Sequence, residues 1–482
     1  EYSVHVVPIS RLTKDALEET ELTSREVERC KNFFTLGLMF WMYGRSADTT
    51  VAWLKKKFAK RPEIAEANTL ALQAGLTYGE VTESIAQRIV APANLPAGSY
   101  RNVNGTTALS LGITAAAMKS EIDILFAAYP ITPASELLHE LSKLRAYKVD
   151  TVQAEDEIAA ICEAIGASFA GRLGITSSSG PGIALKMEAL SLAIMTELPL
   201  VVVDVQRAGP STGLPTKTEQ ADLMQAYFGR PGEAPLCILA ASSPESAFKL
   251  GYEACRIAIK YMTPVMLLSD GYIANCSSPW LIPDPSSLPA FDIPVVEKNN
   301  NEGGDFLPYL RNEETLARPW ALPGTPELMH RIGGLEKKDK TGAVNYDSDN
   351  HEKMCELRAE KIARIAQEIP AIEIDGDQSG DLLVIGWGGT EGALVRATEH
   401  VREQGLSVSR IHLEYLSPLP SDLGDVLSRF KKVMVAEINS GQLSMILRAE
   451  YLVDVVGFNR IRGLPLKVHE LVESIKATVE GI

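Results

Sequence analysis

The sequence predicts an α/β protein with a doubly wound parallel sheet and a second, smaller α/β unit near its carboxyl end. Between residues 107 and 272, short apolar runs alternate regularly with stretches of helical spacing, which indicates repeated strand–helix–strand units. Some runs, such as PLVVVDV at 199–205, are almost continuous, as expected of parallel strands covered on both faces. The 482 residues are too many for one hydrophobic core, and about two to four domains are expected.

The first 95 residues are expected to form a partial N-terminal α/β domain. An initial strand is predicted at 2–9, and three helical segments follow near 24–44, 48–60 and 62–80. The stretch 82–106 is rich in Pro, Gly and Asn, which is typical of a linker and predicts a domain boundary.

The alternating region, 107–272, is predicted to be the main domain. Its strands are expected at 122–128, 149–153, 173–178, 200–206, 236–240 and 264–269. Its helices are expected near 133–146, 156–171, 181–196, 215–228 and 243–261.

The remaining chain is predicted to contain a crossing segment and the smaller α/β unit. Residues 273–370 begin with a long stretch without periodicity, with PGTPELMHRIGGLE as its ordered part, and end in a helix at 351–369. Residues 381–482 open with a strand, a glycine turn and a helix start, and further strands are expected at 407–413 and 432–437. The turn at 386–389 lacks the GxGxxG spacing, which argues against a dinucleotide there.

Composition excludes several classes of protein. The net charge of −15 argues against nucleic acid or an anionic membrane as the main partner. The longest apolar run, at 33–44, is about half of the ~20 residues needed to span a bilayer, and a buried helix is expected instead. The first residues do not resemble a signal peptide, and none is expected.

The cysteines and histidines carry no metal signal. Six cysteines are scattered without a CxxC, which excludes a ferredoxin-type cluster held by this chain alone. Scattered thiols also predict a reducing, cytoplasmic location. Because the seven histidines form no HxH or HxxxH pair, no metal ligand is assigned to this chain.

The stretch 121–157 organises the rest of the chain. An apolar run ends at Ala128, a loop of sequence YPITP follows at 129–133, and a later strand leads into the acids Glu155, Asp156 and Glu157. Two prolines restrict the loop backbone, and loops at the carboxyl ends of parallel strands are where open α/β sheets bind ligands. Taken alone, the pattern also suits an ordinary strand–helix unit with an acidic helix start.

YPITP and the acidic helix start resemble the pyrimidine-binding domain of 2-oxoacid:ferredoxin oxidoreductases, which use thiamine diphosphate. RAGPSTGLPTK at 207–217 and PGTPELMHRIGGLE at 323–336 also resemble this family. VAEINSGQL at 435–443 resembles a motif of its transketolase-like C-terminal domain. The resemblance implies an alpha subunit of the 2-oxoglutarate type with a fused gamma-like domain at 1–95, although the gamma domain's opening GxGGQG loop is absent.

Thiamine diphosphate supplies a carbanion and an electron sink. A carboxyl group bonded to its aminopyrimidine ring helps to form that carbanion, and such a group needs an apolar cleft. In thiamine enzymes this glutamate begins a helix, with a small residue three positions on and a glycine nine positions on. Counting from Glu157 reaches Ala160 and Gly166, so Glu157 is the expected catalytic residue. A plain helix N-terminal charge is the alternative.

The resemblance also implies the substrate and cofactor contacts. Arg207 and Thr132 would hold the carboxylate and carbonyl of the 2-oxoacid, and Lys31 would hold a distal carboxylate. A structural arginine and a solvated lysine are the alternatives for Arg207 and Lys31. The glycine loop at 177–182 would pack beside the pyrimidine. The residues expected to line the cofactor are Tyr129, Pro130, Ile131, Glu157, Ser211, Thr212 and Gly213.

Missing motifs predict a partner chain. No GDG motif for Mg²⁺ and diphosphate is present, so a beta subunit would bring Mg²⁺, the diphosphate end and a [4Fe–4S] cluster. The implied reaction turns a 2-oxoacid, for which 2-oxoglutarate is favoured, and coenzyme A into acyl-CoA, CO₂ and reduced ferredoxin, in an α₂β₂ assembly. Pyruvate or branched-chain 2-oxoacids, a lipoamide-linked dehydrogenase component and a non-enzymatic scaffold are the alternatives.

Overall fold

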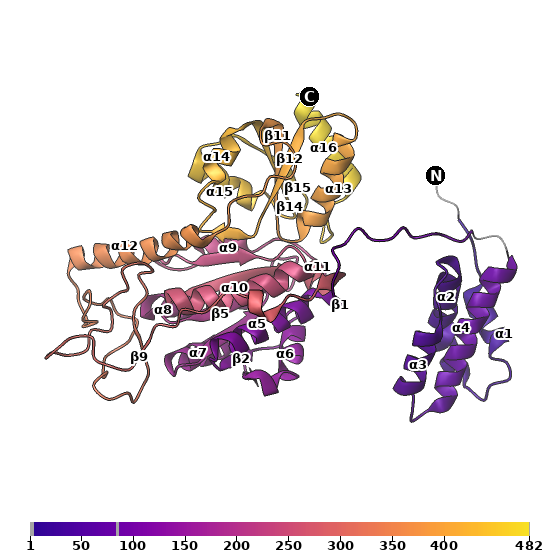
Figure 1. Ribbon diagram of the computed structural model, residues 1–482, viewed down its shortest axis with the longest axis horizontal. Coiled ribbons are helices and arrows are strands. Elements are labelled where there is room, and N and C mark those ends of the chain that lie inside the picture. Colours follow the sequence, from indigo (N-terminus) through magenta and orange to yellow (C-terminus); the bar gives the residue numbers. More distant parts are fainter. Residues whose placement is uncertain (1–3, 83–85, 482) are drawn as a thin grey trace. The chain divides into compact units, whose positions relative to one another are not determined.

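The first of two compact units is helical. The protein is described here by a computed structural model, which covers residues 4–82 and 86–481 and separates Glu1–Ala97 from Gly98–Ile482. The first unit contains α1 (Ile9–Ala16), α2 (Ser24–Met42), α3 (Asp48–Lys57) and α4 (Pro62–Thr82) (Figure 1). Helices α2 and α4 pack closely because Gly37 meets the Leu72 carbonyl, where a Cβ would overlap the oxygen. No described helix is long and apolar enough to cross a membrane.

The strand predicted at 2–9 does not form in the described residues. Residues 4–8 are irregular, Ile9 begins α1, and residues 1–3 lie outside the described part of the chain. Val4 and Val6 are 82% and 89% exposed, so no neighbouring strand covers them. A strand without a partner leaves its backbone groups unpaired, and the expected α/β domain is therefore helical over its described residues.

The second unit is built on a seven-stranded sheet in the order β13-β6-β7-β5-β4-β2-β3. Its strands are β2 (Ile124–Ala128), β3 (Val149–Gln153), β4 (Leu173–Ser178), β5 (Leu200–Gln206), β6 (Cys237–Ala240), β7 (Pro264–Asp270) and β13 (Tyr415–Ser417). All neighbours are parallel except β13, which pairs antiparallel with β6. The central strands β5 and β7 are buried along their whole length, as their continuous apolar runs predict.

Helices cover both faces of this sheet. They are α5 (Gly105–Ser120), α6 (Ser135–Ser142), α7 (Glu157–Phe169), α8 (Gly180–Thr196), α9 (Leu223–Phe228), α10 (Pro244–Tyr261) and α11 (Gly271–Asn275). Helices α5, α6 and α10 share one hydrophobic cluster with the sheet, and α7 and α8 share another. Helix α5 was not anticipated, because its small apolar residues are buried on several sides and show no single apolar face.

The predicted helix at 215–228 is shorter than expected. Only 223–228 is helical, as α9, and residues 215–222 form a loop instead. The backbone amide and carbonyl of Gln220 in that loop bond Ile438 and Asn439 near the carboxyl end of the chain rather than a neighbouring helical turn.

The crossing segment of the second unit, which begins at residue 273, has little regular structure before α12 (Ser348–Arg364). It contributes β8 (Ser277–Leu281), paired with β1 (Tyr100–Asn104), and the short pair β9 (Val295–Val296) and β10 (Trp320–Ala321). Its anchors are Tyr309, Arg318 and Trp320, which are almost fully buried and precede the stretch that was expected to be its ordered part. Helix α12 (Ser348–Arg364) then adds Lys361, which with Arg311 binds the buried carboxylate of Glu197.

The C-terminal domain is a four-stranded parallel sheet in the order β12-β11-β14-β15. Its elements are β11 (Gly380–Trp387), α13 (Glu391–Arg402), β12 (Val408–Leu413), α14 (Leu423–Ser428), β14 (Phe430–Glu437), α15 (Gln442–Tyr451), β15 (Val455–Asn459) and α16 (Val468–Glu480). Strand β15 was not predicted. Strand β13 leaves this domain to extend the seven-stranded sheet, so the two sheets of the second unit are directly connected.

Candidate functional site

The predicted site residues of the main domain meet at one edge of the seven-stranded sheet. Strands β3, β2, β4 and β5 are successive neighbours and run parallel. Their carboxyl ends therefore lie along the same edge, and the segments that follow them carry Glu157, the YPITP loop, the 177–182 glycine loop and Arg207. This edge is the usual ligand-binding position of an open α/β sheet.

The YPITP loop presents polar groups at this edge. Tyr129, Pro130 and Thr132 are exposed, whereas Ile131 packs against the hydrophobic core. The Ile131 carbonyl accepts a 3.0 Å bond from the Ser135 amide at the start of α6, which holds the loop to its helix. The exposed side of the loop is available for contact with another molecule.

Among the three candidate acids, only Glu157 is turned towards the glycine loop. Asp156 caps α7, because its Oδ1 accepts a 2.8 Å bond from the Ala159 amide, and Glu155 is exposed. Glu157 is half-buried, and a Cβ on Gly182 would lie 2.8 Å from its Cγ. Its carboxyl group makes no hydrogen bond with any residue that the structure describes. No hydrogen bond or ion pair joins it to Thr132 or Arg207, although all three follow strands that end at the same sheet edge.

Lys186 holds the backbone of Glu157 through a buried hydrogen bond. Its side chain is almost fully buried, and its Nζ donates 2.9 Å bonds to the Glu157 carbonyl and to Thr176 Oγ1. Burial lowers the pKa of Lys186 to about 8, and the negative charge of Glu157 opposes that change. Sequence reasoning missed this residue. The available signal was a lysine on the buried face of α8, three positions after Ile183.

Arg207 is a buried cation with few direct partners, although its charge lowers the pKa of the nearby Asp222. Its residue is 7% exposed, and its Nη1 donates a 2.7 Å bond to the neutral carbonyl of Thr132. Its Nε is buried without a partner, and it forms no ion pair with the described residues. The same bond joins the two positions that the sequence assigned to substrate binding.

The turn after Arg207 closes on itself. Ala208 and Lys217 are joined by a 2.9 Å backbone bond, and Leu214 donates another to Ala208. Ser211, Thr212 and Gly213 form the exposed tip, where Ser211 and Gly213 have positive φ. These three residues can therefore line the outer wall of a site, but they do not contribute to the core.

A cavity of about 730 Å³ adjoins Arg207 and reaches the C-terminal domain. Asp222, Glu219 and Gln442 are among the residues that line it. A Cβ on Gly180 would lie 2.8 Å from Asp222 Oδ1, so the absence of a side chain there makes room for this acid.

Asp222 forms an acid pair with Asp204 of β5. Burial and the nearby charge of Asp222 raise the pKa of Asp204 well above its usual range. Burial raises the pKa of Asp222 to about 6, against the lowering effects of Asp204 and Arg207. Burial and mutual repulsion therefore favour the protonated form of Asp204, the more deeply buried of the two acids.

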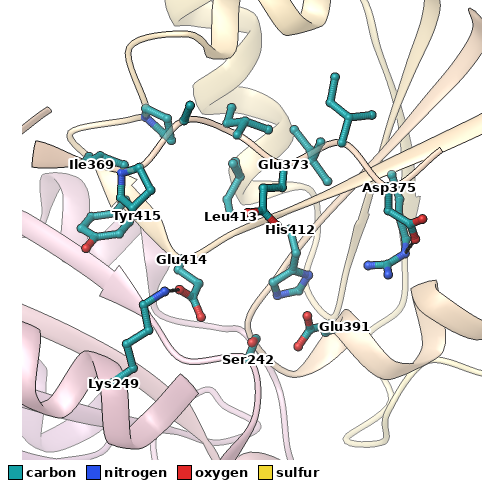
Figure 2. A pocket seen from close by; sticks show the side chains of 17 residues that line it. Ser242, Lys249, Ile369, Glu373, Asp375, Glu391, His412, Leu413, Glu414 and Tyr415 are labelled. Atoms are coloured by element: carbon teal, nitrogen blue, oxygen red, sulfur yellow. Dashed lines mark hydrogen bonds and ion pairs between the residues drawn. The ribbon is translucent and has the colours of Figure 1, made fainter. Parts of the chain in front are cut away.

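A second cavity, of about 470 Å³, lies between α10 and the end of β12 (Figure 2). Its charges are largely paired, Lys249 with Glu414 at 3.0 Å and Asp375 with Arg410 at 2.6 Å. His412 bonds the Gly388 carbonyl through Nε2 at 3.1 Å, and burial lowers the pKa of its ring. None of the predicted site residues lines this cavity.

Glu336, His351 and Cys355 bring one oxygen, one nitrogen and one sulfur atom within 4.8 Å of one another. Arg358 Nη2 lies 3.3 Å from both Glu336 Oε2 and Cys355 Sγ, so a guanidinium already neutralises this group. We assign no ligand to it.

Lys31 belongs to the first unit. It lies on α2, its side chain is 45% exposed, and its Nζ pairs with the Glu28 carboxylate one turn earlier. The exposed ion pair is weak, so the lysine is available for another anion.

Comparison with known proteins places the chain in a family. The family model "Pyruvate flavodoxin/ferredoxin oxidoreductase, thiamine diP-bdg" matches residues 115–348. The 2-oxoglutarate oxidoreductase subunit KorA of Mycobacterium tuberculosis is 50% identical over 484 residues, which cover 100% of this chain and 73% of that protein. The 2-oxoacid:ferredoxin oxidoreductase 1, subunit alpha, of Aeropyrum pernix is 30% identical over 480 residues, which cover 94% and 72%.

A solved structure agrees with these matches. It is a 2-oxoglutarate:ferredoxin oxidoreductase from Magnetococcus marinus with 2-oxoglutarate, coenzyme A and succinyl-CoA bound. The TM-score is 0.87 at 33% identity, covering 98% of this chain and 80% of that chain. The chain therefore belongs to the thiamine-diphosphate-dependent 2-oxoacid:ferredoxin oxidoreductases and corresponds to their alpha subunit.

Proposed function

We propose that this alpha subunit, together with a beta subunit, converts 2-oxoglutarate and coenzyme A into succinyl-CoA, CO₂ and reduced ferredoxin. The names of the KorA relative and of the Magnetococcus marinus complex support this choice of substrate. The observation that carries the proposal is Arg207, a buried guanidinium that forms no ion pair with a described residue and lines a cavity.

Arg207 suits the carboxylate that every 2-oxoacid carries. A buried guanidinium without an ion pair is unfavourable, and a substrate carboxylate would supply a close negative charge and two parallel hydrogen bonds. Thr132 lies beside it, because its carbonyl accepts the Nη1 bond, and its exposed hydroxyl can donate to the substrate's carbonyl oxygen. Ser211, Thr212 and Gly213 would then form the outer wall of this site.

The same sheet edge fits the pyrimidine end of thiamine diphosphate. Ser178 Oγ, Ser179 Oγ, Arg207 Nε and Asp222 Oδ2 are buried there without partners, which is uncommon unless a polar molecule or water is bound. When bound, the cofactor supplies the carbanion and the electron sink. Glu157 would bind its aminopyrimidine ring, and Tyr129, Pro130 and Ile131 would line it. Lys186 would hold the first turn of α7, and hence Glu157, in place.

The diphosphate end requires the partner chain. Because this sequence has neither a GDG motif nor cluster cysteines, the beta subunit would carry Mg²⁺ and a [4Fe–4S] cluster that passes electrons to ferredoxin. We expect an α₂β₂ assembly. Metal analysis, the visible absorption of the cluster and the native mass of the purified complex test these points, and a colourless complex without iron would contradict them.

The central experiment replaces Glu157 by Gln in the reconstituted complex. Turnover of 2-oxoglutarate with coenzyme A and ferredoxin should fall by at least about 100-fold, because general acid–base groups contribute about 10²–10⁴-fold. The complex should still assemble, since Glu157 bonds no described residue through its carboxyl group. Glu155→Gln, two positions earlier and exposed, is the matched control and should keep full turnover. Equal turnover of both variants would remove Glu157 from this role.

A further inference from the structure

Residues 207–222, here named the substrate loop, connect β5 to α9 and carry Arg207. The first half of the loop closes on itself through the Ala208–Lys217 and Leu214–Ala208 backbone bonds. Its second half was expected to be helical and is not. The backbone groups of that half need other partners, because buried amides and carbonyls are rarely left unpaired.

Residues of the C-terminal domain supply such partners, and Gln220 of the loop makes the contacts. Its side chain is fully buried, Nε2 donates a 2.7 Å bond to the Trp387 carbonyl, and Oε1 accepts a 2.8 Å bond from the Ile438 amide. Its backbone amide bonds the Ile438 carbonyl at 3.1 Å, and its carbonyl accepts a 2.9 Å bond from Asn439 Nδ2. A Cβ on Gly388 would lie 2.8 Å from Gln220 Nε2, so the turn there is shaped around this amide.

The Gln220 side chain lies at the edge of the C-terminal sheet where other α/β proteins bind ligands. Trp387 ends β11 and Ile438 follows β14, and these neighbouring strands are flanked on opposite sides by β12 and β15. The crevice at such a reversal of strand order is where open parallel sheets bind ligands. In this protein a side chain of the substrate loop occupies it.

A second side-chain amide, that of Gln442 in the C-terminal domain, bonds the backbone at the end of the loop and at the start of α9. Gln442, the first residue of α15, accepts a 2.9 Å bond from the Met224 amide and donates a 2.9 Å bond to the Ala221 carbonyl. Glu437 fixes the receiving side, because its buried carboxylate binds Trp387 Nε1 and the Leu443 amide at 3.1 and 2.8 Å. This arrangement accounts for Glu437, Asn439 and Gln442 of the VAEINSGQL motif.

The loop end held in this way is coupled to Arg207. The Asp222 amide, two residues after Gln220, donates a 3.1 Å bond to Gln206 Oε1, and Gln206 directly precedes Arg207. Gln206 also donates to the Ser269 carbonyl, so its side chain spans two strands. A shift of residues 220–222 therefore reaches the guanidinium through one hydrogen bond and one peptide.

We propose that Gln220 and Gln442 form an amide clasp that fixes the substrate loop to the C-terminal domain and thereby positions Arg207 for the 2-oxoacid. Both are positioning residues, and through them the C-terminal domain helps to position the substrate site. This inference rests on the proposed role of Arg207 in binding the 2-oxoacid.

The experiment replaces Gln220 by Met, of similar length but without the amide, in the complete complex. KM for 2-oxoglutarate should rise about tenfold with kcat changed less than twofold, since substrate placement is disturbed while the cofactor side is not. Hydrogen exchange of 207–222 should become faster. Gln404→Met is the control, because Gln404 is exposed in the same domain, and it should change neither quantity. Gln442→Met, which removes only the second side-chain amide, should produce the same signature in weaker form.

Each result decides the point. Unchanged KM and unchanged exchange of the substrate loop in both variants would overturn the clasp. A fall in kcat with faster exchange throughout the C-terminal domain would also overturn it, since that is the signature of general unfolding. If Gln220→Met does not fold, Gln442→Met is judged by the same two measurements. If the unaltered complex turns over no 2-oxoacid, the proposed function fails, while exchange of the loop still tests the clasp.

Discussion

Replacing Arg207 by Met should separate activity from stability. Removing one partner of a buried, hydrogen-bonded charge pair costs about 2–5 kcal/mol. A loss of about 3 kcal/mol on the substrate side corresponds to roughly a 150-fold fall in kcat/KM, since 1.4 kcal/mol is about tenfold. Folding should suffer little, because Arg207 forms no ion pair in the free protein and its Nη1 bonds the carbonyl of Thr132, an exposed residue whose carbonyl water can reach. Loss of the Arg207 charge would raise the pKa of the nearby Asp222, which can then take up a proton. An apolar chain of similar volume in place of an unpaired buried charge is neutral or stabilising.

The assay has two parts, kcat/KM of the reconstituted complex and the thermal midpoint of the alpha subunit. Arg207→Lys keeps the charge but not the forked geometry, and it should lie between the wild type and Arg207→Met. Arg230→Met is the matched control. The Arg230 guanidinium bonds the carbonyls of Ala226, Tyr227 and Ala234, so its loss should lower the midpoint and leave kcat/KM unchanged. The reasoning is refuted if Arg207→Met lowers the midpoint as Arg230→Met does.

Two further predictions concern charge. Asp204→Asn should stabilise the subunit at neutral pH. The folded-state pKa of Asp204 is raised, so the protonated acid contributes its full stability below about pH 3.9. Above that pH the free energy of unfolding falls by roughly 1.4 kcal/mol per pH unit until the folded pKa is reached, and Asn avoids this loss. Thermal midpoints at pH 4 and pH 7 test this, and a gain at pH 4 as large as that at pH 7 would contradict it. Lys31→Ala should lower kcat/KM about tenfold or more for 2-oxoglutarate but not for pyruvate, because a charged hydrogen bond contributes about 1.5–3 kcal/mol. The exposed Lys56 is its control, and equal losses with both substrates would end the proposed role of Lys31.

The predicted strands of the main domain lie close to their expected residues, and the reason is local. Strands such as β4 and β5 are buried on both faces, so their apolar runs are continuous and recognisable without knowledge of their neighbours. The strand predicted at 2–9 had the same apolar character, but a strand needs a partner, and no described residue pairs with it. Helix α5 was missed for the opposite reason, since burial on several sides removes the periodicity that reveals a surface helix.

The residue types of the candidate site were predictable, but the hydrogen bonds that hold those residues in place were not. The strand-end positions of Thr132, Glu157 and Arg207 follow from the order of elements along the chain. The Arg207–Thr132 bond, by contrast, joins residues 75 positions apart and depends on β4 lying between β2 and β5. Lys186, which holds Glu157 through its carbonyl, could only be suspected from a lysine on a buried helix face.

The fold class, the family, and the strand ends that carry the polar residues could be read from the sequence, because these depend on local periodicity and short motifs. The folded chain was needed to show that Arg207 is buried without an ion pair, that burial raises the pKa of Asp204, and that Gln220 enters the C-terminal sheet. The physical reason is that burial and charge pairing are set by segments far apart in sequence. The energy of a buried polar group depends on which of those segments meets it.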